Sequence, residues 1–224
     1  MKLKIPFVKQ LHGNDCGIAC VKMIGKFYGY NFSERKILDV VELHSDGVLA
    51  GELANYLLEE GFEVEIHSFD LNLFDPKLQK LSGLKLFKKV KDTVYFGKNV
   101  WKSVGLKAII KFIEMGGKIK IIPPKEKTLI DFLKKKMPLI ICLKSGILYD
   151  KKTLMGHYLV LNGYNKNSFI VNDPYYKGEY AIKKDKLMFA LQAHSIDSTA
   201  YLIKAKPKKH FSPQNKLLIE EIEW

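Results

Sequence analysis

Cys16 is the residue of this sequence best placed for nucleophilic chemistry. It follows Asn14 and Asp15, two residue types typical of helix N-termini, and begins an apolar pattern with helical spacing. We expect Asp15 to cap that helix, so that free backbone N–H groups and the helix dipole favour the thiolate of Cys16. Cys20, one turn further on, and Cys142, inside an apolar run, are predicted to be small buried residues.

A thiolate nucleophile needs a histidine to exchange the proton. Of the six histidines, His157 stands directly after Gly156 at the exposed start of a strand-like run, and it lies 141 residues after Cys16. In one well-known class of cysteine enzymes the histidine follows the cysteine by roughly 130–150 residues. His157 is therefore the predicted base.

A third residue must hold the imidazole ring in place. Asp173 ends the next strand-like run, and the register of two paired strands can bring its carboxylate beside His157. Asn172 is the alternative. Because neighbouring residues of a strand point to opposite faces, only one of the two can serve.

Gln10 is the candidate for stabilising negative charge. It lies six residues before Cys16, on the segment that approaches the predicted helix. Its amide and the backbone N–H of Cys16 could both donate to the oxyanion of a tetrahedral intermediate.

The elements that would position these residues follow from periodicity. The expected elements are helices over 16–28, 34–41 and 48–60, a strand over 62–69, a helix over 128–136, a strand from 138, and strands over 157–163, 168–173 and 199–205. Gly61 is expected to end the third helix, and the strands at 157 and 168 to form a hairpin.

The order of these elements predicts the α+β class, with N-terminal helices packed on a C-terminal antiparallel sheet. Residues 70–124 are irregular and lysine-rich, with one amphipathic segment over 106–115, and we expect a mostly helical insertion there. One domain over 1–205 and a tail or docking helix over 206–224 are expected.

Composition excludes several classes of protein. The chain has 224 residues, of which 47% are hydrophobic and 27% charged, as in globular proteins. Its longest apolar run is far shorter than the roughly 20 residues that a membrane span needs, and the N-terminus lacks the apolar stretch of a secretory signal. Three cysteines, an odd number, do not suggest a disulfide framework. A cytoplasmic location is expected.

The charge balance bears on partners. The formal net charge is +13, yet Arg35 is the only arginine. Nucleic-acid recognition draws heavily on arginine, so no nucleic acid is expected as partner, whereas a basic surface can attract an acidic peptide. Cys16 and Cys20 could offer two metal ligands, but no CxxC, HExxH or GxGxxG motif accompanies them, so neither metal nor cofactor is expected.

Two segments together resemble a known family. QLHGNDCGIACVKMIGKFYG, with Gln10 and Cys16, and GHYLVLNGYNKNSFIVNDP, with His157 and Asp173, resemble the papain-like cysteine peptidases of the bacteriocin-processing, double-glycine leader peptidase family and their standalone relatives. The resemblance covers residues 10–69 and 128–205.

The resemblance implies a papain-like fold with Cys16 as nucleophile, His157 as general base and acid, Asp173 as orienting acid and Gln10 in the oxyanion hole. The best-known members of that family are domains of peptide-exporting transporters. This sequence has no GxxxxGK[ST] phosphate loop and no membrane span, so any transport would need association with separate transporter or biosynthetic proteins.

The predicted function is hydrolysis of a peptide or isopeptide bond through a thioester acyl-enzyme. Three alternatives remain open at this point. An amine could replace water as acyl acceptor, which would make a transpeptidase or an amide-forming acyltransferase; the cleft could bind peptides without catalysis; or the basic surface could bind nucleic acid.

Overall fold

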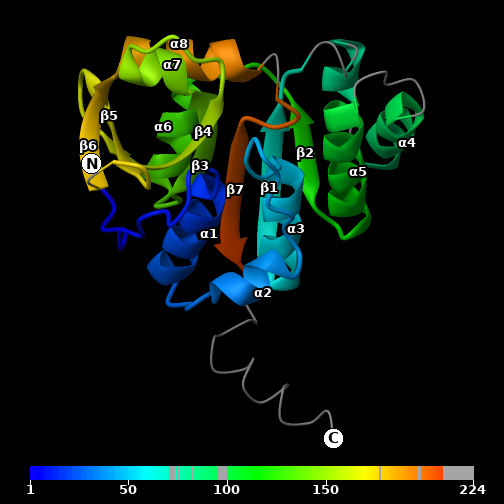
Figure 1. Ribbon diagram of the computed structural model, residues 1–224. Coiled ribbons are helices and arrows are strands. Elements are labelled where there is room, and N and C mark those ends of the chain that lie inside the picture. The colour runs from blue at the N-terminus through cyan, green and yellow to red at the C-terminus, as the bar shows by residue number, and fades with distance from the viewer. Residues whose placement is uncertain are drawn as a thin grey trace, which may run out of the picture.

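The computed structural model describes residues 1–70, 74, 76–81, 83–94, 100–176, 178–195 and 198–208. A seven-stranded sheet in the order β2-β1-β7-β3-β4-β5-β6 forms the centre of the molecule (Figure 1). The strands are β1 (Phe62–Ser68), β2 (Lys118–Ile121), β3 (Leu139–Lys144), β4 (Gly156–Tyr164), β5 (Ser168–Asp173), β6 (Gly178–Lys183) and β7 (Leu202–Pro207). Neighbouring strands pair antiparallel, except that β1 and β2 are parallel.

Helices cover both faces of this sheet. They are α1 (Cys16–Phe27), α2 (Glu34–Leu38), α3 (Ala50–Glu59), α4 (Gly83–Val94), α5 (Val100–Glu114), α6 (Glu126–Lys134), α7 (Ser145–Tyr149) and α8 (Lys184–Ser195), with a 3-10 helix, η1 (Pro76–Lys80). In Figure 1, α1 and α3 lie in front of the sheet and α5 lies beside α3.

Alternation along the strands divides the core in two. Ile140 and Cys142 of β3 belong to the apolar cluster under α1, α3 and α5, whereas Ile141 and Leu143 belong to the cluster shared with α6, α7 and α8. Because successive side chains of a strand point to opposite faces, one central strand contributes to both clusters.

The helix ends mostly follow the local signals. Gly29 and Gly61 adopt positive φ angles of 85° and 80° just after α1 and α3, a conformation that glycine adopts without strain. The hydroxyl of Ser33 caps α2 by accepting from the backbone N–H of Lys36.

Asp15 does not behave as expected. It occupies the N-cap position of α1, but its side chain makes no capping hydrogen bond. The carboxylate instead accepts from the backbone N–H groups of Leu11 and His12, at 3.0 and 3.1 Å. The predicted cap is therefore wrong, because the carboxylate is used to fold the loop before the helix.

The predicted α+β class and the β4–β5 hairpin are confirmed. Four elements are additional: β2, β6, α7 and α8. Within 70–124 the described residues form η1, α4 and α5, together with β2. Residues 209–224, most of the predicted tail, lie outside the described residues, and β7 ends at Pro207. No helix in the described ranges combines the length and hydropathy needed to cross a lipid bilayer.

A buried carboxylate links the edge strand β2 to the sheet. Glu65 of β1 lies 2.9 Å from the Lys120 ammonium of β2, 3.2 Å from that of Lys204 of β7 and 2.7 Å from the His67 ring. Burial opposes ionisation of Glu65, but the hydrogen bonds from His67 and Lys120 outweigh it, and its pKa is lowered. The cluster ties three neighbouring strands together.

Candidate active site

Cys16 is the first residue of α1, and its side chain is 7% exposed. The helix packs against β4, the strand that carries His157. Gly17 makes this close approach possible, because a Cβ atom there would lie 2.8 Å from Leu53 Cδ1 and 3.2 Å from Tyr158 Cδ2. The sequence therefore places a small residue where the start of α1 meets the sheet.

His157 joins the thiol to a carboxylate. Its Nε2–H donates to Asp173 Oδ1 at 2.8 Å, and the Cys16 thiol is close enough to favour the charged form of the ring. Because Nε2 is engaged by Asp173, Nδ1 is the ring nitrogen left for the thiol. His157 is buried rather than exposed as expected, at 7% of its surface.

Burial lowers the pKa of His157, but the hydrogen bonds with Asp173 and then Cys16 more than compensate. The result is a pKa raised from 6.5 to about 9. At neutral pH the ring is an imidazolium, which is the partner that stabilises a thiolate.

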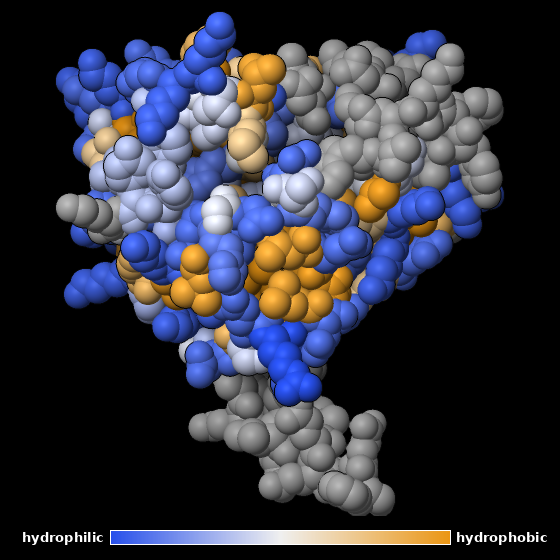
Figure 2. All heavy atoms as spheres, viewed as in Figure 1, coloured by the Kyte–Doolittle hydropathy of each residue, from blue (hydrophilic) through white to orange (hydrophobic). Residues whose placement is uncertain are grey.

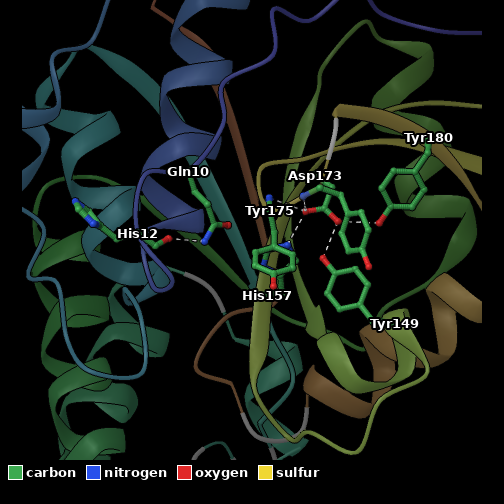
Figure 3. Close-up of polar contacts among 8 residues, drawn as sticks. Gln10, His12, Tyr149, His157, Asp173, Tyr175 and Tyr180 are labelled. Carbon is green, nitrogen blue, oxygen red and sulfur yellow. Dashed lines mark hydrogen bonds and ion pairs between the residues drawn. The ribbon is translucent and has the colours of Figure 1, made fainter.

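Asp173 is the centre of a group of donors (Figure 3). The hydroxyls of Tyr149 and Tyr180 donate to Oδ2 at 2.7 and 2.8 Å, and the backbone N–H groups of Tyr175 and Tyr176 donate to Oδ1 at 3.0 and 3.4 Å. Burial would raise the pKa of Asp173, but the hydrogen bonds from His157 and the two phenols lower it below its ordinary value. Asp173 is thus an oriented carboxylate.

Asn172, the alternative partner of His157, points elsewhere. Its amide donates to the backbone oxygen of Ile5 and its side-chain oxygen accepts from Asn162, both at 3.2 Å. The alternation along β5 thus leaves Asp173 at the histidine.

Gln10 lies beside this group on the loop before α1. Its amide nitrogen donates to the backbone oxygen of His12 at 2.6 Å, and its own backbone N–H donates to Pro174 at 3.0 Å. A side-chain amide carries two hydrogens, so one remains for a further acceptor. Asp15, which binds the backbone of Leu11 and His12, holds the same loop in shape.

The other two cysteines are buried free thiols, as predicted. Sequence reasoning missed the partner of one of them: Cys142 Sγ lies 3.1 Å from His194 Nε2. It also missed Tyr149 and Tyr180. The alternating segment 178–183 could have indicated a strand bearing Tyr180, but nothing local marks Tyr149 or His194.

Some side chains in the described ranges lie close enough together to hold a metal ion. Two groups there have ligand atoms close enough to hold an ion: His12, Asp15 and Glu34, and Glu42, His44 and Glu52. Neither group includes a cysteine or His157.

Comparison with known proteins identifies the family of the chain. The family described as "Peptidase_C39 like family" matches residues 2–195. The chain therefore belongs to the C39-like peptidase family, and the resemblance found in its two sequence segments is confirmed. No curated protein sequence matches the chain significantly.

Two solved structures resemble the fold at low sequence identity. A double glycine motif protease from an AMS/PCAT transporter, solved in complex with the leader peptide, is 15% identical, with a TM-score of 0.48 and coverage of 92% of this chain and 94% of that one. The peptidase domain of Streptococcus ComA, a bi-functional ABC transporter involved in quorum sensing, is 18% identical, also with a TM-score of 0.48, covering 92% and 100%.

Proposed function

We propose that this protein is a cysteine peptidase that hydrolyses a peptide or isopeptide bond through a thioester acyl-enzyme. The observation that carries the proposal is the position of His157 between Asp173, which its Nε2–H reaches at 2.8 Å, and Cys16, whose thiol favours the charged ring. Membership of a peptidase family supports it.

The first half of the reaction forms the acyl-enzyme. The Cys16 thiolate attacks the carbonyl carbon, and the electron pair of the C=O bond moves onto oxygen. The free amide hydrogen of Gln10 and the backbone N–H of Cys16 donate to that oxyanion. As the intermediate collapses, the His157 imidazolium gives its proton to the leaving amine and the C–N bond breaks.

The second half releases the product. The neutral His157 ring takes a proton from water, the resulting hydroxide attacks the thioester, and the thiolate leaves with the acid as product. Asp173 holds the ring orientation through both halves, because its own position is fixed by the two tyrosine hydroxyls.

We propose a peptide substrate for this site, with any transport carried out by other chains. A cytoplasmic location is part of the proposal, and the free state of all three cysteines supports it.

A substitution at Cys16 tests the mechanism. Wild-type protein, Cys16→Ala and the matched control Cys20→Ala are incubated with a mixed peptide library, and fragments are identified by mass spectrometry. We expect Cys16→Ala to lose activity by about 10³-fold or more, since the nucleophile is absent, and Cys20→Ala to retain it. Iodoacetamide should alkylate Cys16 faster than a free cysteine peptide.

Three results would overturn the proposal. Cleavage by Cys16→Ala at the wild-type rate would remove Cys16 from the reaction. Absence of any cleavage by wild-type protein, with Cys16 no more reactive than a free thiol, would indicate a peptide-binding module without catalysis. Conjugates formed with added glycinamide instead of free acids would indicate a transpeptidase.

A further inference from the structure

Asp15 directly precedes Cys16 in the chain, and it is buried, with 2% of its surface exposed. Burial of a carboxylate is costly unless hydrogen-bond donors surround it. The donors here are backbone N–H groups: that of Leu11 lies 3.0 Å from Oδ2, and that of His12 lies 3.1 Å from both oxygens. The carboxylate therefore closes the loop between Leu11 and Asp15 into a turn.

The backbone of His12 connects this carboxylate to Gln10. Its N–H donates to Asp15, and its carbonyl oxygen accepts from Gln10 Nε2 at 2.6 Å (Figure 3). The other polar atom of the Gln10 amide, Oε1, is buried and has no hydrogen-bond partner among the described residues. The position of the His12 carbonyl therefore decides where the second amide hydrogen of Gln10 points.

Residues 10–15 lie outside the helices and strands, so individual contacts determine the shape of this loop. At its start the backbone N–H of Gln10 donates to the carbonyl oxygen of Pro174 at 3.0 Å, and at its end the carbonyl oxygen of Asp15 accepts from the N–H of Ala19 in α1 at 3.1 Å. These two bonds fix the ends of the loop. The Asp15 carboxylate fixes Leu11 and His12 between them.

The placement of Gln10 matters because a donor to an oxyanion is effective only if it is already oriented when the negative charge develops. A misplacement of about 1 Å can lower the rate of a reaction by about 10²-fold. The Gln10 amide is held through one side-chain hydrogen bond, to the His12 carbonyl. A change that frees His12 would therefore let this amide turn away from the oxyanion.

We propose that Asp15 is a positioning residue for the reaction: through the backbone of His12, its carboxylate holds Gln10 with one amide hydrogen directed at the oxyanion. The inference rests on the proposed function, since an oxyanion forms only when Cys16 attacks a carbonyl group. Asparagine at position 15 would offer one acceptor oxygen, and its NH₂ group would face a backbone N–H. Asp15→Asn should therefore loosen the loop while the Cys16 sulfur stays in place.

Two reagents that modify Cys16 differ in whether an oxyanion forms. Iodoacetamide alkylates the sulfur by displacement of iodide, without addition to a carbonyl group. With p-nitrophenyl acetate the sulfur adds to the carbonyl, an oxyanion forms, and a thioester replaces the ester bond as p-nitrophenolate leaves. Both rates are corrected with Cys16→Ala. We expect Asp15→Asn to lower the acylation rate about 10-fold or more and to change the alkylation rate less than about 3-fold.

A double variant tests whether Asp15 acts through Gln10. Gln10→Ala should lower the acylation rate by about 10²-fold or more, as loss of an oxyanion donor does. Adding Asp15→Asn should lower it less than about 3-fold further, because the amide that Asp15 positions is already absent. Asp39→Asn makes the same chemical change at an exposed residue and should acylate as wild type. Circular dichroism checks folding, and Asp15→Ser replaces Asp15→Asn if the latter does not fold.

Several outcomes would overturn this role of Asp15 and leave the peptidase intact. They are an acylation rate in Asp15→Asn equal to that of wild type, an equal fall in acylation and alkylation, and a double variant that loses the full product of the two single losses. If neither variant at position 15 folds, Asp15 serves the fold and the proposal is also wrong. Wild-type protein that p-nitrophenyl acetate does not acylate at Cys16 would instead remove the proposed function, and this role with it.

Discussion

His157 keeps its proton well above neutral pH because two neighbours favour the charged ring. Asp173 supplies the larger of the two hydrogen-bonding effects and Cys16 the smaller, and together they outweigh burial. With a folded-state pKa raised to about 9, the stabilisation from this histidine is complete below its ordinary pKa of 6.5 and is lost as pH rises through about 9.

The alkaline limb of the pH–activity profile should follow the titration of His157. We expect kcat/KM to fall as pH rises through about 9, because the leaving amine then lacks its proton donor. Asp173→Asn should shift that limb to lower pH and reduce kcat. Asp150→Asn, at a carboxylate whose side chain is 81% exposed, is the control and should leave the limb in place. If the alkaline limb of Asp173→Asn stayed at the wild-type pH, the assignment of that limb to His157 would be contradicted.

The phenols of Tyr149 and Tyr180 donate hydrogen bonds to Asp173, and we expect them to hold its carboxylate in position. Tyr149→Phe removes the hydroxyl that donates to Oδ2 at 2.7 Å, and with it about 1–3 kcal/mol of unfolding free energy. Since that hydrogen bond lowers the pKa of Asp173, its loss should raise this pKa. The contribution of Asp173 to stability, present above its ordinary pKa of 3.8, should then fade at a higher pH than in wild type.

Tyr175→Phe is the matched control for this prediction. Tyr175 reaches Asp173 through its backbone N–H, and its side chain is 55% exposed. Denaturant unfolding and kcat/KM measured against pH should therefore match wild type. If stability and kcat/KM fall at the same acid pH in Tyr149→Phe and Tyr175→Phe, the Tyr149 hydroxyl has no positioning role.

At the residue scale, the sequence predicts the main candidate residues of the site, and the residues that it misses share one physical reason. Residue type, spacing and a resemblance point to Cys16, His157, Asp173 and Gln10. The structure pairs His157 with Asp173, places Cys16 near that ring, and joins the backbone of Gln10 to Pro174, next to Asp173. Tyr149 and His194 are missed because each meets its partner across the fold, from helices that are not neighbours of that partner in sequence. Their catalytic and binding roles remain predictions.

Among the elements, the contact between α1 and the sheet decides where the thiol lies. Val48 and Leu53 occupy the space that a side chain at Gly17 would need. Alanine at this position improves helix propensity by about 1 kcal/mol, yet it must displace a packed core.

We expect Gly17→Ala to lower the free energy of unfolding by about 1–3 kcal/mol, because the steric cost exceeds the gain in propensity. Gly13→Ala is the control, since an added Cβ at Gly13 would meet no atom within 4 Å. It should change the free energy of unfolding by less than about 0.5 kcal/mol. Urea denaturation measures both. A more stable Gly17→Ala would show that α1 can move away from β4 without cost.

Elements with strong periodicity are predicted well, and the elements missed have weak local signals. Helices α1 and α3 have buried faces and glycine stops. Strand β2 has only four residues, alternates lysine with isoleucine and lies at the edge of the sheet, where short, charged strands are common. Its place beside β1 is fixed by tertiary contacts such as Lys120 with Glu65.

At the scale of the whole molecule, net charge is the property that acts on a substrate as it approaches. The net charge is +13, and the face seen in Figure 2 is largely hydrophilic, with a hydrophobic patch over α3. A basic surface raises the rate at which acidic peptides arrive.

Matched peptides that differ only in glutamate or glutamine, away from the cleaved bond, should reveal this effect. We expect the glutamate peptide to have the higher kcat/KM at low salt. The ratio should approach one as ionic strength rises from about 0.01 M to about 1 M, where the Debye length shrinks from about 30 Å to about 3 Å. A ratio that is independent of salt would show that the excess lysine plays no part in substrate capture.

The joining of α1 to β4 has a consequence for the nascent chain. Cys16 leaves the ribosome 141 residues ahead of His157, an interval of about 7–28 s at ordinary rates of translation. During that time His157 is not beside Cys16, so under the proposed mechanism the site forms only when the later strands assemble.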